Sequence, residues 1–341
     1  MGRRSQKKKK TIVDIAEASG VSVSTVSRII NNKPDVAEET RQRVLQLMEE
    51  QGFTPQITWQ QLRSGKSPFI ALNFPQDFNP PSHGIITAAA LGVEDADYSL
   101  NLIAKSLNDN DLLSVFRSGQ SDGMILMEIL LQDPRVELLR EHDFPFVMIG
   151  RCANNSGLSY VDIDIEKGVD DAFQHLIDLG HRQIGFVTML QKLEEKQYGF
   201  TTWAVNGYKN VCQKHGIAVH WREIDGDEAH AKTAVSELLD ETPEITALVT
   251  PQQSGVPGVL KAVRERGLLV PEDISIIGLL TDPIGELLTP PLTTIGFPAS
   301  ELGMEAARIL IGHLEGALTA PQQMLLRPEF IVRGSTGPAR T

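Results

Sequence analysis

The stretch TIVDIAEASGVSVSTVSRIINNKPDVAEETRQRV, residues 11–44, decides how the front of this chain folds. Its first part predicts a helix, because its apolar residues fall on one helical face: Ile12, Val13, Ile15, Ala16 and Ala18. Gly20 can adopt the left-handed conformation that ends a helix. Ser22 is a good N-cap for a second helix, whose buried stripe would consist of Val26, Ile29 and Ile30.

A third helix is expected next, with Asp35 or Ala37 near its start and Gly52 at its end. Its core face would consist of Val44, Leu45, Leu47 and Met48. Two short helices joined by a glycine turn form a helix-turn-helix, whose second helix can enter the major groove of DNA. Three helices around one small core can fold as a unit, so we expect an all-α DNA-binding head at residues 1–53.

Charge is divided unevenly along the 341 residues, whose net charge is -12. Residues 1–66 hold 12 Lys and Arg against 7 Asp and Glu, whereas the remainder holds 20 against 37. A basic front on an acidic body indicates a nucleic-acid-binding module attached to a body that avoids nucleic acid. The run GRRSQKKKK, residues 2–10, is either part of that module or a solvated tail.

Bulk composition indicates a globular cytoplasmic protein of two or three domains. Hydrophobic residues make up 41% of the chain and charged residues 22%, which is typical of that class. No apolar run reaches the roughly 18 residues of a membrane helix, and no apolar segment follows the lysines as in a secretory signal. Cys152 and Cys212 fit no metal motif and predict buried thiols in a reducing compartment.

The N-terminal part of a recognition helix faces base edges, which nominates Val23, Ser24 and Arg28 as DNA-reading residues. Arg28 can bond bidentately to guanine O6 and N7, which is worth about 1–3 kcal/mol of discrimination. Val23 can offer apolar contact to a thymine methyl group. The short polar side chains nearby either contact phosphate or serve as caps and solvated surface: Thr11, Ser22, Thr25, Ser27 and Asn31.

Three segments now make the chain recognisable: DIAEASGVSVSTVSRIINN at 14–32, VAEETRQRVLQLMEEQGFTP at 36–55 and QQLRSGKS at 60–67. They resemble the lactose-repressor and purine-repressor family of bacterial transcription regulators. The phrase VSxxTVSRxxN is specific to that family, and every fixed position is kept here. The resemblance extends from about residue 11 to residue 334 and implies a non-enzymatic repressor that binds operator DNA.

The same resemblance gives residues 54–67 the role of a hinge that folds when a dimer meets its operator. Leu62 matches the leucine that wedges into the central minor groove, where an apolar side chain can unstack and kink DNA. The other interpretation of Leu62 is an ordinary linker leucine. Trp59 departs from the family, which usually has a small residue where two hinge helices pack closely.

The body, residues 68–337, alternates short apolar runs with helical patterns, which predicts doubly wound parallel sheets in two subdomains. Predicted strands are FIALNF at 69–74, SLNLIAK at 99–105, DGMILM at 122–127, PFVMIG at 145–150, YVDID at 160–164, QIGFVTM at 183–189, ALVTP at 247–251 and ISIIGLL at 274–280. Predicted helices include residues 84–98, 169–181 and 258–268. The resemblance implies a periplasmic-binding-protein-like α/β core, with subdomains at about 68–168 plus 298–326 and 169–297 plus 327–337, crossing near Gly168, Phe297 and Arg327.

Catalytic groups are not evident in the body. Asp162 and Asp164 are either a pair of carboxylates on one strand face or solvated strand-end residues, and the second interpretation is favoured. His175 and His181 fit surface or packing positions. No phosphate-binding loop, nucleophile elbow or metal-ligand spacing occurs, so we expect no enzyme, no cofactor and no metal site.

A small-molecule effector is expected in a cleft between the subdomains, at the carboxyl ends of the strands. The family's usual polar ligand groups are replaced here by Ala204, Pro251 with Gln252, and Leu280. A hydroxyl-rich sugar needs convergent polar partners, because each buried polar group left unpaired costs about 1–3 kcal/mol. Either the cleft takes a less polar or differently shaped ligand, or effector control has been lost.

Four residues fall at family positions that line the cleft: Met127, Arg151, Trp203 and Phe297. Each has another interpretation. Met127 and Phe297 also fit core packing, Trp203 fits a loop lid or a surface position, and Arg151 fits an ion pair with a nearby acid.

A homodimer is predicted, since one helix-turn-helix reads too few bases and a two-fold dimer reads a palindrome. The segment IVRGSTGPART, residues 331–341, lacks the leucine heptads that some relatives use to form tetramers. The sequence therefore predicts a cytoplasmic, ligand-modulated repressor of a palindromic operator. The alternative is a sugar-like small-molecule binding protein with a vestigial head, which the intact VSVSTVSR and Leu62 disfavour.

Overall fold

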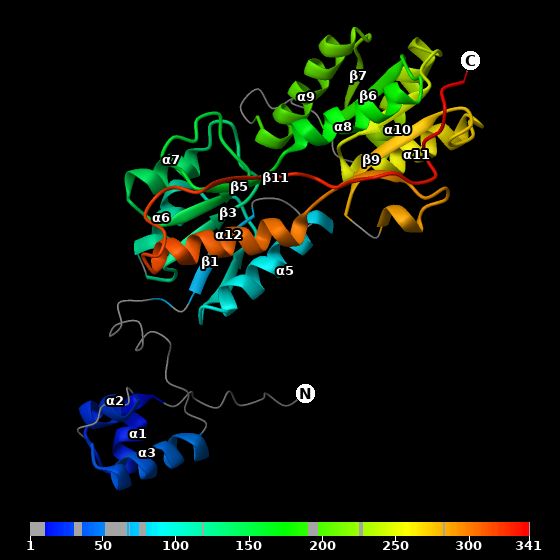
Figure 1. Ribbon diagram of the computed structural model, residues 1–341. Helices are drawn as coiled ribbons and strands as arrows, with labels where there is room; N and C mark the ends of the chain where they lie inside the picture. Colours follow the sequence, from blue (N-terminus) through cyan, green and yellow to red (C-terminus); the bar gives the residue numbers. More distant parts are fainter. Residues whose placement is uncertain are drawn as a thin grey trace. The chain divides into compact units, whose positions relative to one another are not determined.

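The computed structural model describes residues 11–30, 36–51, 67, 69–74, 80–117, 119–189, 197–224, 228–281 and 284–340 (Figure 1). The chain divides into two compact units, Met1–Ser67 and Pro68–Thr341. We call them the head and the core and describe each by itself. Among the described residues, no helix combines the length and the apolar character needed to span a membrane.

The head contains three helices: α1 Ile12–Ser19, α2 Val23–Ile30 and α3 Glu38–Glu50. Thr11 and Asp14 form a reciprocal capping box at the start of α1, and Gly20 ends it at φ 67°. Ser22 caps α2, since its Oγ accepts a hydrogen bond from the Thr25 backbone N–H at 3.1 Å. These caps confirm the predicted helix starts and the glycine turn.

The head's core consists of apolar side chains from all three helices: Ile12, Ile15, Ala16, Val26, Ile29, Val44 and Met48. Three predicted core residues are wrong. Val13, Ala18 and Leu45 are exposed, Val13 at 49% and Leu45 at 46%. Each lies one or two positions after a buried residue, where a helix of 3.6 residues per turn has already rotated its side chain away from the core.

The core consists of two lobes, each with a six-stranded sheet. The first lobe has strand order β11-β5-β4-β3-β1-β2, and all neighbours are parallel. Its strands are β1 Phe69–Asn73, β2 Ser99–Ile103, β3 Gly123–Leu126, β4 Phe146–Ile149, β5 Tyr160–Ile163 and β11 Gln323–Leu326. Its helices are α5 Pro80–Glu94, α6 Asp109–Arg117, α7 Pro134–Glu141 and α12 Ala299–Leu314.

The second lobe has strand order β12-β10-β9-β8-β6-β7, in which only the short β12 runs antiparallel to its neighbour. Its strands are β6 Ile184–Met189, β7 His220–Ile224, β8 Ala247–Thr250, β9 Ser275–Leu280, β10 Thr293–Gly296 and β12 Phe330–Ile331. Its helices are α8 Ile165–Asp178, α9 Gly199–His215, α10 Glu228–Glu241 and α11 Val256–Glu265, with 3-10 turns η1 Gln253–Gly255 and η2 Ile284–Leu287.

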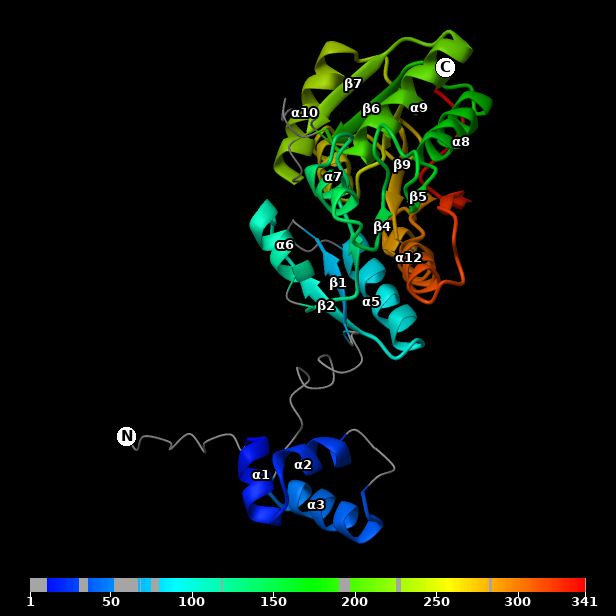
Figure 2. The same ribbon diagram turned by 90° about the vertical axis from the view of Figure 1, so that its left-hand side faces the viewer.

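Helices cover both faces of each sheet. Figure 2 shows α6 on one side of the first lobe's sheet and α5 with α12 on the other, and the buried clusters on the two faces agree with this. In the second lobe, α8 and α9 enclose one apolar cluster and α10 and α11 another. Every predicted strand and helix of the core is present, which confirms the doubly wound α/β class. The near-continuous burial of β3, β8 and β9 is typical of parallel strands.

The chain passes between the lobes three times: from β5 to α8, from β10 to α12, and from β11 to β12. The last passage is the long C-terminal segment that runs from one lobe to the other in Figure 1. Phe297 lies in the second passage and packs against the apolar clusters of both lobes. Because each lobe is assembled from separated stretches of chain, the space between the lobes is bounded by residues far apart in sequence.

Candidate functional site

The first candidate surface is the exposed part of α2. Val23 and Ser24 are exposed in its first turn, Val23 at 37%, and Arg28 is exposed in its last turn. The Ser22 hydroxyl lies 2.7 Å from that of Ser24 and 2.8 Å from that of Thr25, so the three hydroxyls form one cluster at the helix start. An exposed apolar side chain, an exposed guanidinium and clustered hydroxyls make this helix chemically suited to base edges and phosphates.

Other predicted DNA contacts lie around this surface or outside the described residues. Thr11 is exposed and donates its hydroxyl to Asp14 at 2.8 Å, and Ser27 is half-buried. Arg41 and Arg43 of α3 donate to the carbonyls of Ile29 and Ser19 at the ends of α2 and α1. These bonds fix the three helices together and place cations at two helix C-termini. Asn31, Trp59 and Leu62 lie outside the described residues.

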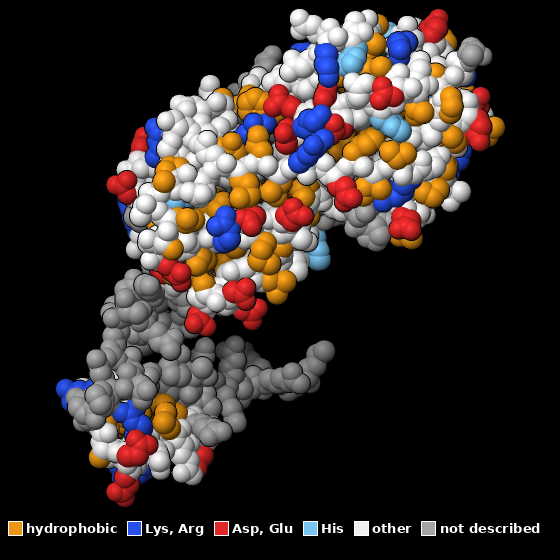
Figure 3. All heavy atoms as spheres, viewed as in Figure 1, with side chains coloured by type: hydrophobic (Ala, Val, Ile, Leu, Met, Phe, Trp, Pro, Cys, Tyr) orange, Lys and Arg blue, Asp and Glu red, His pale blue; other side chains and the backbone are white. Residues whose placement is uncertain are grey.

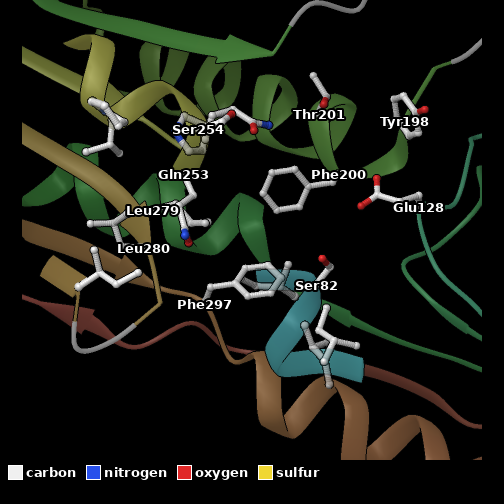
Figure 4. Close-up of a pocket in the computed structure, with 18 of the residues that line it drawn as sticks. Ser82, Glu128, Tyr198, Phe200, Thr201, Gln253, Ser254, Leu279, Leu280 and Phe297 are labelled. Carbon is white, nitrogen blue, oxygen red and sulfur yellow. The ribbon is translucent and has the colours of Figure 1, made fainter. Parts of the chain in front are cut away.

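The second candidate site is a cavity of about 870 Å³ between the two lobes (Figure 4). Its walls are largely apolar and come from both lobes and from the passage between them. They include Ile85, Phe200, Leu279, Leu280, Phe297 and Leu302. Of the four residues nominated from the sequence, Met127 and Phe297 line this cavity, whereas Arg151 and Trp203 are not among its lining residues.

Glu128 is a lining residue that the sequence analysis missed. It lies two residues after the end of β3, with its backbone at φ 53°, a strained conformation for a residue with a side chain. Arg135 holds this turn: it donates to the carbonyls of Met127 and Glu128 at 3.1 and 3.0 Å, and it pairs with the Asp133 carboxylate at 2.7 Å. Burial raises the pKa of Glu128 to about 7, and the positive charge of Arg135 opposes that rise. Its place at the carboxyl end of a central strand could have identified it.

Asp162 is the second lining carboxylate, at 6% exposure on β5. The favoured solvated strand-end interpretation is therefore wrong for this residue. Its carboxylate accepts bonds from the Ile163 N–H at 2.8 Å and from Arg151 Nε at 3.2 Å. Burial raises its pKa to about 7, against the lowering effect of Arg151. Asp164 has a different role. Its carboxylate caps α8 by accepting a hydrogen bond from the Lys167 N–H at 3.1 Å.

Arg151 joins the two lobes behind this wall of the cavity. Its guanidinium bridges Asp162 of the first lobe and Glu166 of the second, each at 3.2 Å. It also lies over the Trp203 ring of α9, 4.4 Å from the ring centroid. The ion-pair interpretation of Arg151 thus describes its contacts, and an effector role for Arg151 or Trp203 stays a prediction.

A backbone clasp also connects the lobes. The Leu131 N–H donates to the Gln197 carbonyl at 2.8 Å, and the Gly199 N–H donates to the Ile129 carbonyl at 3.1 Å. A side chain at position 199 would not fit, because its Cβ would lie 2.6 Å from the Arg151 carbonyl oxygen. The clasp fixes the loop after β3 against the start of α9.

Of the three positions where the resemblance implies polar ligand groups, two line the cavity and one does not. Pro251, Gln252 and Leu280 line the cavity, whereas Ala204 is fully buried between α8 and α9 and is not among the lining residues. Thr201 is a further lining residue that the sequence analysis missed, at 2% exposure. No feature of the sequence distinguished it from the neighbouring Thr202.

His175, His181 and the two cysteines have structural roles in the core. His175 bonds the Thr336 hydroxyl at 3.0 Å, and buried His181 bonds the Thr246 hydroxyl and the Gly337 carbonyl. Both cysteines are buried and free, as predicted. Within the described part of the chain, no group of three or more His, Cys, Asp or Glu side chains is arranged to hold a metal ion.

Comparison with known proteins finds a family match in the head and another in the core. Residues 11–56 match the family described as bacterial regulatory proteins, lacI family, and residues 173–336 match a periplasmic binding protein-like domain. The HTH-type transcriptional repressor CytR of Escherichia coli strain K12 is 31% identical over 345 residues, covering 98% of this chain and 99% of CytR.

Two solved structures share the fold. The complex of the transcriptional regulator CelR with cellobiose has a TM-score of 0.70 at 27% identity and covers 96% of this chain and 99% of CelR. The lac repressor dimer bound to operator and the anti-inducer ONPF has a TM-score of 0.84 at 22% identity, covering 97% of this chain and 100% of the repressor chain.

Proposed function

Since the chain belongs to the lacI family of bacterial regulatory proteins and is a DNA-binding transcriptional regulator, we propose that it is a dimeric repressor controlled by a ligand between its lobes. Three exposed side chains of α2 carry this proposal: Val23 and Ser24 in the first turn and Arg28 in the last. Arg28 would read a guanine in the major groove, and Val23 a thymine methyl group. Thr11, Ser22, Thr25, Ser27 and Asn31 would contact phosphates, and Leu62 would enter the central minor groove.

A dimer is proposed because two heads are needed to read a palindrome long enough for specificity. Exposed apolar side chains on neighbouring helices support it: Leu91 of α5 is 53% exposed and Met304 of α12 is 40% exposed. The solved lac repressor neighbour is itself a dimer on its operator. We place the protein in the cytoplasm, where its operator lies and where two buried free thiols stay reduced.

The cavity between the lobes would bind the effector. The CelR neighbour carries cellobiose, which supports a small-molecule role for the matching region of this chain. A ligand can control DNA binding only if it binds one arrangement of the lobes more tightly than the other. The side chains that bound this cavity come from both lobes, so relative movement of the lobes would alter the site itself.

The test is binding to DNA upstream of the protein's own gene, with Arg28→Ala as the variant and Arg43→Ala as the charge-matched control on α3. Arg28→Ala should cost about 1–3 kcal/mol on the specific site and much less on random DNA. Arg43→Ala should weaken both DNAs alike, because it removes a charge and the bond to the Ser19 carbonyl without removing a base contact, and a melting curve of each variant checks that the head stays folded. If Arg28→Ala weakened specific and random DNA equally, base reading by α2 would be refuted.

A further inference from the structure

The start of α9 forms part of the wall of the cavity between the lobes (Figure 4). Thr201, in the first turn of this helix, lines the cavity and is 2% exposed. Its Oγ1 is buried and makes no hydrogen bond to any described residue. A buried hydroxyl without a partner destabilises the folded protein, and a bound ligand atom would remove that penalty. Thr201 is therefore a polar group that the fold leaves open to a ligand.

The structure around α9 explains why this hydroxyl has no partner. A threonine inside a helix usually bonds the carbonyl four residues earlier. Thr202 does so, donating to the Tyr198 carbonyl at 3.1 Å. The carbonyl four residues before Thr201 belongs to Gln197, which lies before the helix and accepts from the Leu131 N–H in the clasp at 2.8 Å. The clasp between the lobes thus occupies the carbonyl at that position.

Backbone donors lie next to the same hydroxyl. The first N–H groups of a helix have no partner within the helix, and Tyr198 makes no side-chain capping bond at this end of α9. The Gly199 N–H bonds the Ile129 carbonyl in the clasp, and the N–H groups of Phe200 and Thr201 follow it in the first turn. The helix dipole adds a partial positive charge at this end. The start of α9 therefore favours a hydrogen-bond acceptor.

Each acid that lines the cavity has a cation of the protein nearby. The acids and their cations are Asp162 with Arg151, Glu228 with Lys261, and Glu128 with Arg135. The first two are ion pairs at 3.2 and 3.0 Å. In the third, burial raises the pKa of the carboxyl and the positive charge of the arginine opposes that rise. The other lining cation, Arg264, is exposed on α11, where water solvates it. The wall thus holds counter-charges for its acids, which favours an uncharged ligand.

The remaining polar side chains of the wall are uncharged: Ser82, Tyr198, Thr201, Gln252, Gln253 and Ser254. The apolar ones include two aromatic rings, Phe200 of α9 and Phe297 of the passage between the lobes. Figure 4 shows both rings extending into the cavity from these separate segments. Aromatic rings pack favourably against another aromatic ring. The cavity therefore combines aromatic surface with uncharged hydrogen-bonding groups.

We propose that this cavity binds an uncharged aromatic carbonyl compound, with its carbonyl oxygen at the Thr201 hydroxyl and its ring against Phe200 and Phe297. The inference rests on the proposed function, since it names the ligand class of the same regulatory cavity. A carbonyl oxygen has two lone pairs, so it can accept from the hydroxyl and from a backbone N–H together. A carboxylate would add a negative charge to a cavity already lined by Glu128 and Asp162, whose pKa values burial raises to about 7. An ammonium group would face the positive end of the helix and has no acceptor.

The first test is the stability of the ligand-free protein. Thr201→Val replaces the hydroxyl with a methyl group of similar shape, so the melting temperature should stay unchanged or rise by about 2 °C. Thr293→Val is the matched control. Its buried hydroxyl accepts from the Arg333 N–H at 3.0 Å, and its loss should lower the melting temperature by more than about 2 °C. A fall in Thr201→Val as large as in Thr293→Val would contradict the proposal, because it would give the Thr201 hydroxyl a partner within the fold.

The second test is calorimetric titration of the full-length protein with 2-naphthamide, 2-naphthoate, 2-naphthylmethylamine and cellobiose. The amide should bind more tightly than the anion, the amine and the sugar, and Thr201→Val should weaken its binding by about fivefold. Thr202→Val is the control on the next residue, since its hydroxyl already bonds the Tyr198 carbonyl, and it should bind the amide as the wild type does. The proposal is overturned if another probe binds as tightly as the amide, if Thr201→Val binds the amide as the wild type does, or if the amide does not bind.

Specific binding to upstream DNA is measured on the same preparations. If DNA binding is intact and the amide fails, the ligand class is wrong and the proposed function stands. If wild-type protein shows no specific DNA binding, the proposed function fails whatever the cavity binds.

Discussion

Glu128 and Asp162 are carboxylic acids in surroundings that oppose their charge. Both line the cavity between the lobes, and burial raises the pKa of each to about 7. Their positive neighbours differ, because Arg151 bonds the Asp162 carboxylate directly whereas Arg135 bonds the Glu128 backbone carbonyl. Burial therefore opposes ionisation of both carboxyls, and the neighbouring arginines reduce that opposition.

Replacing Glu128 with Gln should change how stability depends on pH. Because the folded-state pKa of about 7 lies above the ordinary value of 4.5, the folded state holds the proton more strongly. Its contribution to stability is present below about pH 4.5 and is lost as the pH rises through 7, by at most about 1.4 kcal/mol per pH unit. Urea unfolding of wild type and Glu128→Gln across this range measures it. Parallel curves for the two proteins would contradict the assignment.

At the scale of elements, one side chain from a loop links three elements across the two lobes. Arg151 follows β4 and reaches β5, α8 and α9 through Asp162, Glu166 and Trp203. The charges of Arg151 and Asp162 are mostly buried, with side-chain exposures of 13% and 8%. Removing one partner from such a pair leaves a buried charge uncompensated.

Arg151→Met should therefore lower the free energy of unfolding by about 3 kcal/mol, because Asp162 would stay buried without its cation. The double variant Arg151→Met with Asp162→Asn should recover much of that loss. Arg327→Met is the control, since Arg327 is 68% exposed in its pair with Asp171 and should cost at most about 1 kcal/mol. Equal losses in Arg151→Met and Arg327→Met, measured by chemical denaturation, would refute a stabilising role for the bridge.

Helices α5 and α12 illustrate close packing at the same scale. Gly303 of α12 has no room for a side chain, since a Cβ there would meet the Ile85 carbonyl and the Ala89 backbone nitrogen of α5. Gly303→Ala should force the helices apart and destabilise the protein by about 1–3 kcal/mol. Ser300→Ala, exposed one turn earlier on α12, is the control and should leave the melting temperature within a degree or two. A melting temperature unchanged in Gly303→Ala would show that the contact is looser than this.

At the scale of the whole molecule, the charge of the acidic core differs from that of the basic N-terminal region, and this difference affects where DNA can bind. Asp and Glu side chains are scattered over the face of the core in Figure 3, with hydrophobic side chains among them. Such a surface repels the DNA backbone, so affinity for DNA depends on the head. In the proposed dimer the core would join two heads, and the exposed Leu91 and Met304 on α5 and α12 are suited to that contact.

Leu91→Glu should shift the protein from dimer to monomer in sedimentation experiments and weaken operator binding by more than about tenfold, because a buried charge at an interface opposes association. Val219→Glu introduces the same charge at another exposed apolar residue, 54% exposed next to β7, and should leave the dimer intact. If the Leu91→Glu protein remained dimeric, the dimer interface could not include this part of α5.

Local sequence determined the elements of this protein. Apolar runs, helical periodicity, caps such as Ser22 and the turn at Gly20 depend on residues a few positions apart, so many helices and strands could be predicted from the chain itself. The strands β7, β10, β11 and β12 were not predicted. The family's motif in α2 added the DNA-binding role. Only the tertiary structure decided how Leu131 meets Gln197, how Arg151 bridges to Glu166, and that Glu128 and Thr201 line the same cavity. Those contacts join residues from separate lobes, and their geometry follows from packing that no local pattern encodes.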